Sequence, residues 1–198
     1  MKQLSKLILN SMETDLKPNR VQLLKMHYGV EVLRNEGIKI ILLTVIFSLL
    51  GQAEVFLFCI SLLIPVRIFS GGLHMKTNVS CFLFSFCFFS SAILLLPRIP
   101  ISETGYRIVL GFAVMLVCIL SPIAASRKPI VSRQKFLRCK YSAVISSIAA
   151  GVLLYNISYS LFQHSGIWTL ALQALQLSAA YLHSKFKERK NENEKIQT

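Results

Sequence analysis

The sequence predicts an all-α, polytopic integral membrane protein with about six membrane segments. Apolar residues make up 54% of its 198 residues, and charged residues only 16%. The ranges 79–97, 108–126 and 141–162 contain no acidic or basic residue. Apolar stretches of about 18 or more residues are longer than an ordinary buried helix and long enough to cross a bilayer. A buried soluble bundle would need polar helix faces, which these ranges lack.

Residues 1–37 are expected to form a cytoplasmic N-terminal segment of one or two amphipathic helices. Leu4, Leu7, Ile8 and Met12 recur at helical spacing beside lysines. Such a helix would lie on the membrane surface or pack against other cytoplasmic parts, and the pattern leaves both alternatives open. No short apolar run is followed by a small-residue cleavage site, so we expect no signal peptide.

Residues 38–183 are predicted to form the membrane domain, and 184–198 a polar tail. The first two apolar arms, 38–50 and 55–66, each span roughly 18–20 Å as helices, which is short for an apolar layer of about 30 Å. They therefore form either two short spans or a re-entrant hairpin. The longer apolar segments that follow lie at about 79–97, 105–124, 141–162 and 166–183.

The distribution of basic residues predicts that both termini are cytoplasmic. All of the 22 lysines and arginines except Arg98 and Arg107 lie in four regions: 1–39, 67–78, 125–140 and the tail. With six crossings these regions share one side, as the positive-inside rule expects. The same reasoning attributes the net charge of +13 to topology rather than to nucleic-acid binding. It also predicts that residues 67–81 lie at the cytoplasmic face.

The cysteine pattern predicts neither a disulfide framework nor a metal site. The count is odd, no CxxC pair occurs, and most of the cysteines have apolar neighbours, as expected of small hydrophobic side chains in a membrane. One histidine with scattered cysteines does not assemble a ligand set, so we predict no metal or other cofactor. The five cysteines are Cys59, Cys81, Cys87, Cys118 and Cys139.

The most informative segment is 67–81, in which His74 and Cys81 lie seven residues apart. A thiol attacks a carbonyl carbon as the thiolate, and a neighbouring histidine accepts its proton or stabilises its charge. His74 and Cys81 are therefore a candidate base and a candidate nucleophile. A continuous helix would hold them about 10 Å apart, too far for a hydrogen bond.

The chain between these two residues must bend for their side chains to meet. Asn78 and the break before the next apolar run would permit the bend. Gly71-Gly72 allows backbone conformations that other residues avoid. Cys81 would then lie at the start of a helix, where the helix dipole favours the thiolate.

The sequence does not identify the groups that would assist this pair. Asn78, Ser80 and backbone N–H groups at the helix start are candidate donors to an oxyanion. No carboxylate lies within 67–81 to orient the imidazole. Glu36 and Glu54 are candidates by residue type alone, and a backbone carbonyl or another distant residue is the alternative.

Arg67, Ser70-Gly71-Gly72, His74 and Cys81, with the surrounding hydropathy, resemble the accessory gene regulator B (AgrB) family. The likeness extends over nearly the whole chain: its length, its basic amphipathic start, Tyr28-Gly29, and a basic loop that contains Lys128-Pro129. Members of this family are membrane cysteine endopeptidases of Gram-positive bacteria. They process the precursor of a cyclic autoinducing peptide used in quorum sensing.

The resemblance implies that Cys81 is the nucleophile and His74 its base, with Arg67 and Gly72 at supporting positions. The enzyme would cut a short precursor after its signal segment and hold the N-terminal product as an acyl thioester. A cysteine or serine of the peptide would then close a thiolactone or lactone ring. The precursor would have an amphipathic leader and an acidic C-terminal part. The resemblance also implies a homodimer in the cell membrane.

The basic loop 125–140 contains no acidic residue and could attract an acidic precursor tail. This makes Arg127, Lys128, Arg133 and Lys135 candidate substrate-binding residues. Alternatively, the loop only fixes the topology, and Arg67 likewise would be only a positive-inside anchor.

The alternative function is that of a non-enzymatic membrane protein, such as a small transporter or channel subunit. A transporter is expected to place ionisable residues within its spans. The three uncharged ranges contain only Ser, Asn, Tyr and Cys as polar residues. Their composition disfavours ion or proton coupling.

Overall fold

The computed structural model of the chain describes residues 20–72, 77–123, 133–157 and 160–196. Every regular element in these ranges is helical, which confirms the predicted all-α class. The elements are α2 (Arg20–Leu49), α3 (Ala53–Ser70), α4 (Asn78–Ser90), a π-helical turn η1 (Ser91–Leu95), a 3-10 turn η2 (Leu96–Arg98), α5 (Glu103–Leu120), α6 (Arg133–Asn156) and α7 (Ser160–Ile196). The predicted amphipathic positions from Leu4 to Met12 lie outside the described residues.

Four helical stretches in the described part of the chain are long and apolar enough to cross a membrane. They support the prediction of a polytopic membrane protein. The count of six crossings and the cytoplasmic placement of both termini stay predictions. The four stretches are Ala53–Ser70, Asn78–Arg98, Glu103–Leu120 and Phe136–Asn156.

α3 is longer than the apolar arm that the sequence predicted for residues 55–66. It contains 18 residues, from Ala53 to Ser70, and therefore spans about 27 Å, close to the thickness of the apolar layer. The predicted arm was short because the run of apolar residues ends before Arg67. Helical hydrogen bonding continues beyond this residue, up to the bond from Gly71 N–H to the Arg67 carbonyl.

α2 joins two stretches that the sequence divided near residue 37. The predicted apolar arm 38–50 is the C-terminal part of a single helix of 30 residues. The charged residues in its middle do not interrupt it, because Glu31 pairs with Arg34 and Glu36 with Lys39 across one helical turn. The helix ends where the sequence placed a break, before Gly51, which has a φ of 68°.

The chain divides into two compact units, Met1–Leu49 and Leu50–Thr198. The first contains α2, and the second contains α3 to α7. The division predicted from the sequence, into an N-terminal segment (1–37), a membrane domain (38–183) and a tail (184–198), stays a prediction. α7 continues as a helix through the predicted start of the tail.

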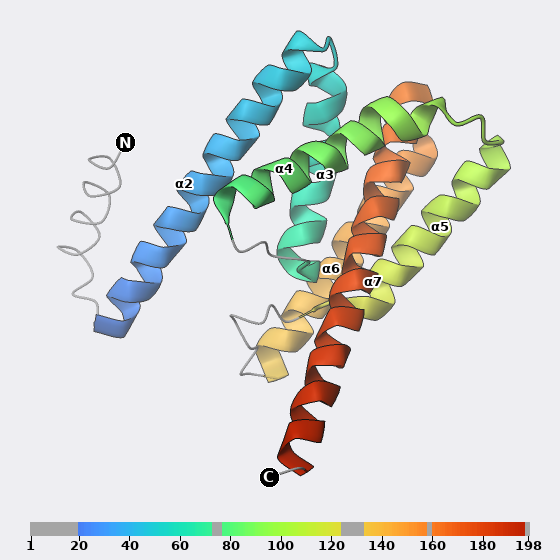
Figure 1. Cartoon of the computed structure of the whole chain (residues 1–198). Helices are drawn as coiled ribbons and strands as arrows, with labels where there is room; N and C mark the ends of the chain where they lie inside the picture. The colour runs from blue at the N-terminus through green and yellow to red at the C-terminus, as the bar shows by residue number, and fades with distance from the viewer. Residues whose placement is uncertain (1–19, 73–76, 124–132, 158–159, 197–198) are drawn as a thin grey trace. The chain divides into compact units, whose positions relative to one another are not determined.

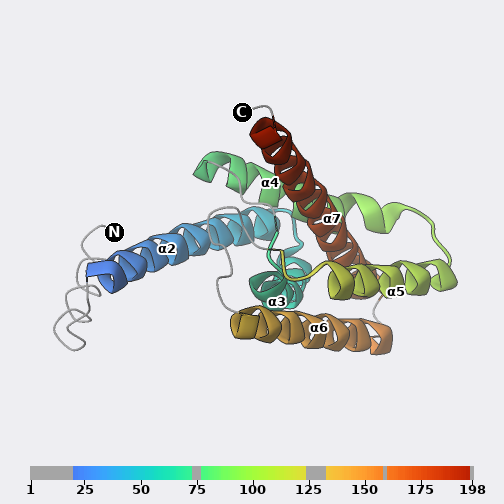
Figure 2. The same cartoon turned by 90° about the horizontal axis from the view of Figure 1, so that it is seen from below.

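In the second unit, successive helices from α3 to α7 alternate in direction (Figure 1). α3 and α5 each pack against both α6 and α7, and Figure 2 shows α3 beside α6 and α5 beside α7. The core between these four helices therefore fixes the end of α3 against α7. Its buried residues are Leu62, Val66, Tyr106, Leu110, Ala113, Val117, Ala150, Leu154, Ile167, Leu170, Ala174 and Leu177.

α4 is joined to α3 by aromatic packing. The rings of Phe56 and Phe89 meet edge to face, with centroids 4.9 Å apart. Phe88 packs on Phe89 in the same manner at 5.3 Å. These contacts lie in the C-terminal half of α4, whereas Cys81 lies in its first turn.

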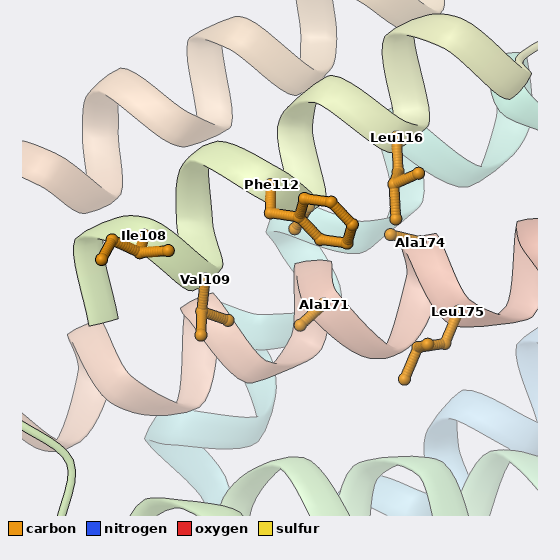
Figure 3. Close-up of a pocket in the computed structure, with 8 residues that line it drawn as sticks. Ile108, Val109, Phe112, Leu116, Ala171, Ala174 and Leu175 are labelled. Atoms are coloured by element: carbon orange, nitrogen blue, oxygen red, sulfur yellow. The ribbon is translucent and has the colours of Figure 1, made fainter. Parts of the chain in front are cut away.

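A groove of about 250 Å³ lies between α5 and α7 (Figure 3). All of its lining side chains are apolar, so it offers no group for acid–base or nucleophilic chemistry. The lining residues are Ile108, Val109, Phe112, Ala113, Leu116, Ala171, Ala174 and Leu175.

Candidate active site

α3 ends at two glycines that lead into the segment containing His74. Gly71 has a φ of 82° and Gly72 a φ of 155°, conformations that strain any residue with a Cβ. A Cβ on Gly71 would also lie 2.6 Å from the carbonyl oxygen of Ile123. Glycine is thus required at position 71 both by its conformation and by the close approach of another part of the chain.

Ile123, which follows α5, connects the end of α3 to the basic region. Its N–H donates to the Ser70 carbonyl at 3.0 Å. Ile123 precedes the basic region 125–140 in the sequence, and this bond places it beside the C-terminal end of α3. This hydrogen bond supports the prediction that 67–78 and 125–140 lie on the same side. Which side of the membrane this is stays a prediction.

Two glutamines of α7 hold the end of α3. Gln173 Nε2 donates to Ser70 Oγ at 3.3 Å and to the Gly71 carbonyl at 3.2 Å. Gln176 Oε1 accepts from Arg67 Nη1 at 3.1 Å. Neither glutamine was predicted to belong to the site. The signal that would have found them is their spacing of three residues within an otherwise apolar run.

The start of α4 is fixed by Thr77, a third residue that was not predicted to belong to the site. Thr77 Oγ1 accepts from the Ser80 N–H at 3.2 Å and lies 2.8 Å from Ser80 Oγ. Ser80 Oγ also lies within hydrogen-bonding distance of the Thr77 carbonyl, at 3.1 Å. These contacts form an N-terminal cap. They occupy the Ser80 N–H and hydroxyl, which were candidate oxyanion donors.

Cys81 lies in the first turn of α4, as the sequence predicted. Its N–H makes the first bond of the helix, to the Thr77 carbonyl at 3.1 Å. The thiol-bearing residue is partly exposed, whereas Cys59 is buried in α3. The N–H groups of Asn78 and Val79 precede the first helical bond, and they are therefore the backbone donors that the helix start offers to an anion.

The site residues predicted from the sequence form two groups in the structure. At the end of α3, a polar cluster held by Gln173 and Gln176 brings together Arg67, Ser70, Gly71 and Gly72. At the start of α4, the capped turn brings together Asn78, Ser80 and Cys81.

The remaining predicted site residues are not brought into these groups. His74, Arg127 and Lys128 lie outside the described residues. Arg133 is exposed at the start of α6, and Lys135 follows it in that helix.

Neither carboxylate considered as a partner for His74 belongs to the two groups. Glu54 lies in the first turn of α3, at the opposite end of that helix from Arg67. Glu36 pairs with Lys39 in α2. Within the described ranges, no three side chains of the types His, Cys, Asp and Glu gather as metal ligands do.

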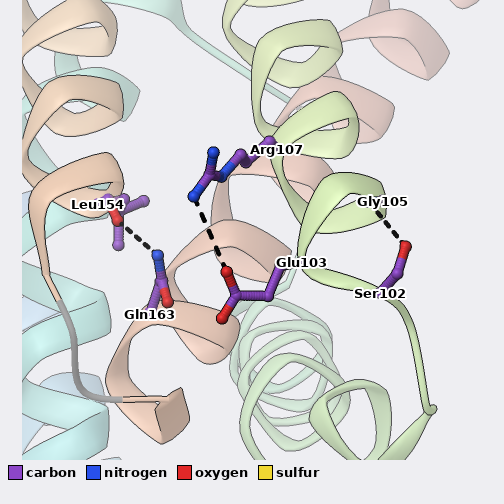
Figure 4. A network of polar contacts seen from close by, with 6 residues as sticks. All are labelled: Ser102, Glu103, Gly105, Arg107, Leu154 and Gln163. Carbon is purple, nitrogen blue, oxygen red and sulfur yellow. Dashed lines mark hydrogen bonds and ion pairs between the residues drawn. The ribbon is translucent and has the colours of Figure 1, made fainter.

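A second polar region lies at the other end of the helical unit (Figure 4). There Gln163 Nε2 donates to the Leu154 carbonyl at 3.1 Å, and Glu103 lies 3.8 Å from Arg107. The His164 imidazole stacks on Tyr106, with ring centroids 3.8 Å apart. Burial lowers the pKa of His164 below its usual value, and the nearby charge of Glu103 partly opposes this effect. None of these groups was predicted to belong to the site.

These features define a polytopic, all-helical membrane protein with a partly exposed thiol at a capped helix start. The sequence model of the family described as accessory gene regulator B matches residues 3–177. The chain therefore belongs to the AgrB family. Membership assigns it a role in bacterial accessory gene regulation, which implies the processing of an autoinducing peptide.

Individual relatives agree with this assignment. "Putative AgrB-like protein 1" of Clostridium perfringens is 26% identical over 182 residues, which cover 91% of this chain and 97% of that protein. "Accessory gene regulator protein B" of Staphylococcus carnosus is 25% identical and covers 69% of each chain. "Putative AgrB-like protein" of Clostridium beijerinckii is 22% identical and covers 80% of this chain and 78% of that protein. No solved structure matches the chain.

Proposed function

We propose that the chain is a membrane cysteine endopeptidase that removes the C-terminal part of a short autoinducing-peptide precursor and promotes cyclisation of the remainder. The observation that carries the proposal is the thiol of Cys81. It is partly exposed in the first turn of α4, beside N–H groups that precede the first helical bond, in a chain of the AgrB family. A helix start favours an anion, and therefore a thiolate or an oxyanion.

In the first step, His74 takes the proton of Cys81 Sγ, and the thiolate attacks the carbonyl carbon of the scissile peptide bond. The N–H groups of Asn78 and Val79 are the proposed donors to the oxyanion that forms. The C–N bond then breaks, and the departing amine takes the proton from His74. The N-terminal product stays on Cys81 as an acyl thioester.

In the second step, a cysteine or serine side chain of the same product attacks the thioester carbonyl. It loses its proton, the bond to Cys81 Sγ breaks, and the Cys81 thiol is restored. The result is a thiolactone or lactone ring. Transfer to the attached side chain is favoured over hydrolysis because a tethered nucleophile has a high effective concentration. A site at a membrane boundary also limits access of water.

The proposed substrate is a precursor with an amphipathic leader and an acidic C-terminal part. Arg127, Lys128, Arg133 and Lys135 are the proposed contacts for the acidic part. The bond between the Ile123 N–H and the Ser70 carbonyl supports this assignment, because Ile123 precedes the basic region in the sequence and lies beside the end of α3. We further propose that the protein acts as a homodimer, with its site at the cytoplasmic face of the cell membrane.

Co-expression with a short precursor peptide of the proposed kind tests the proposal. Cys81→Ser is expected to abolish cleavage, and His74→Ala to reduce it by about 100-fold to 10,000-fold, as removal of a general base does. Cleavage is measured by mass spectrometry of the peptide products, at equal amounts of membrane-inserted protein.

Cys87→Ser is the matched control, because Cys87 is an exposed thiol further along the same helix. It is expected to cleave normally. Normal cleavage by Cys81→Ser would overturn the proposal. Loss of cleavage in Cys87→Ser as well would show that the assay detects a general effect of cysteine replacement in α4.

A further inference from the structure

Gln173 and Gln176 are unusual among the residues of the apolar core. Gln173 is fully buried and Gln176 is 5% exposed. Amide groups are costly to transfer into an apolar environment. The two residues lie one helical turn apart, and their hydrogen bonds go to consecutive parts of one segment, Arg67 to Gly71.

The two glutamines bond to the end of α3 through different amide atoms. Gln173 donates through Nε2, and Gln176 accepts through Oε1. Among the described residues, Gln173 Oε1 and Gln176 Nε2 are buried and have no hydrogen-bond partner. A buried amide atom without a partner lowers stability. Stability alone therefore does not explain why this pair lies here.

The pair also covers the backbone at the point where the chain leaves α3. A Cβ on Gly72 would lie 3.7 Å from Gln176 Cδ and 3.9 Å from Gln173 Nε2. The glutamines thus contact the last described backbone before the segment that contains His74. The Gln173 amide holds the Gly71 carbonyl, and the Ile123 N–H holds the Ser70 carbonyl. Both contacts therefore fix the backbone just before that segment.

The geometry points to Gln173 and Gln176 as positioning residues of the endopeptidase site. Gln173 holds the backbone from which the His74 segment departs, and Gln176 holds the guanidinium of Arg67. This inference rests on the proposed function. Neither glutamine touches the reacting atoms. Their loss should lower kcat while KM is retained, because a displacement of about 1 Å can reduce the rate about 100-fold.

The different use of the two amides makes a sharp test possible. Gln176→Glu keeps an oxygen for Arg67 and replaces an Nε2 that has no partner in the described part of the chain with a second oxygen. The added negative charge lies beside the Arg67 guanidinium, so kcat should stay near normal. Gln176→Leu removes the acceptor and should lower kcat. Gln173→Glu replaces the donor with an oxygen facing the Gly71 carbonyl, and Gln173→Leu removes the donor without adding charge, so both should lower kcat.

Gln163→Glu and Gln163→Leu are the matched controls. Gln163 lies on the same helix and its amide also donates to a backbone carbonyl, that of Leu154, but at the other end of the unit. Both control variants should keep normal kcat and KM. The full-length variants are compared in membranes at equal protein amount, with kcat and KM measured for cleavage of the precursor.

The inference is supported if Gln173→Leu and Gln176→Leu lose kcat at unchanged KM while Gln176→Glu keeps it. It is overturned if both leucine variants cleave normally, if Gln176→Glu and Gln176→Leu have equal kcat, or if the Gln163 variants lose as much. Gln173 variants that do not reach the membrane leave the decision to the Gln176 pair. Cys81→Ser in the same assay separates the two proposals, because normal cleavage by that variant refutes the endopeptidase itself.

Discussion

The two ends of the helical unit use glutamines of the same helix in different surroundings. Gln163 donates to the Leu154 carbonyl of α6, and Gln173 donates to the Gly71 carbonyl at the end of α3. Gln163 is partly exposed and has an exposed ion pair, Glu103 with Arg107, in its neighbourhood. Gln173 is fully buried, beside a second glutamine and a buried serine.

This difference indicates which end of the helical unit is more sensitive to substitution. The side chains of Glu103 and Arg107 are 89% and 60% exposed, and exposed pairs of this kind contribute about 0–1 kcal/mol. A buried donor or acceptor that loses its partner costs about 1–3 kcal/mol. The end that leads into the His74 segment is thus the more strictly specified end.

Gly71→Ala is expected to be the most damaging single substitution at the buried end. A φ of 82° in a residue with a Cβ costs about 1–3 kcal/mol. The approach of 2.6 Å to the Ile123 carbonyl adds to this, because backbone cannot move aside easily. The midpoint of thermal unfolding of the purified protein should fall clearly.

Gly111→Ala is the control for this substitution. Gly111 lies within α5, and nothing would meet an added Cβ within 4 Å. Alanine there should stabilise the helix by about 0.5–1 kcal/mol. If the two alanine variants unfolded at the same temperature, the account of the α3 end would be wrong.

Gln173→Leu and Gln163→Leu compare the two ends directly. The first should lower the free energy of unfolding by about 1–3 kcal/mol, because it leaves the buried Ser70 Oγ and the Gly71 carbonyl without this donor. The second should cost less, because water replaces the amide at the partly exposed end. Unfolding in denaturant at constant detergent measures both. Equal losses would show that burial does not distinguish the ends.

His164 should give a small dependence of stability on pH. Its folded pKa is lowered by burial, so the unfolded chain binds more protons as the pH falls. The contribution of neutral His164 to stability is complete above the unfolded pKa of about 6.5. It is lost as the pH falls through that value toward the folded pKa. His164→Phe, which keeps a ring for the stack on Tyr106, should reduce this slope. If the substitution left this slope unchanged, the dependence of stability on pH would come from other titratable groups.

Sequence patterns predicted the features that depend on local chemistry. Uncharged apolar ranges predicted the helices, and the pair Gly71-Gly72 indicated where the chain could leave the helical conformation. The start of α4 near Cys81 followed from the break before the next apolar run. The continuity of α2 was missed, because charges that pair within one helical turn do not interrupt a helix.

The contacts of the candidate site with distant residues could not be predicted in the same way. Gln173 and Gln176 lie more than a hundred residues after Ser70 and Arg67. Hydropathy marks them only as polar interruptions of α7. Their role depends on how α7 packs on α3. The approach of Ile123 to Gly71 depends in turn on where the chain runs after α5. The sequence therefore predicted the site residues but not the tertiary contacts that hold them.

Identification of the residue that carries the acyl group tests the endopeptidase proposal. A precursor whose ring-closing cysteine or serine is replaced by alanine should accumulate as a thioester on the enzyme. We expect peptide mass spectrometry to find the N-terminal fragment attached to Cys81 and released by hydroxylamine, and to find Cys87 unmodified. Attachment to any other residue, or cleavage of this precursor without a covalent adduct at any time point, would contradict the account.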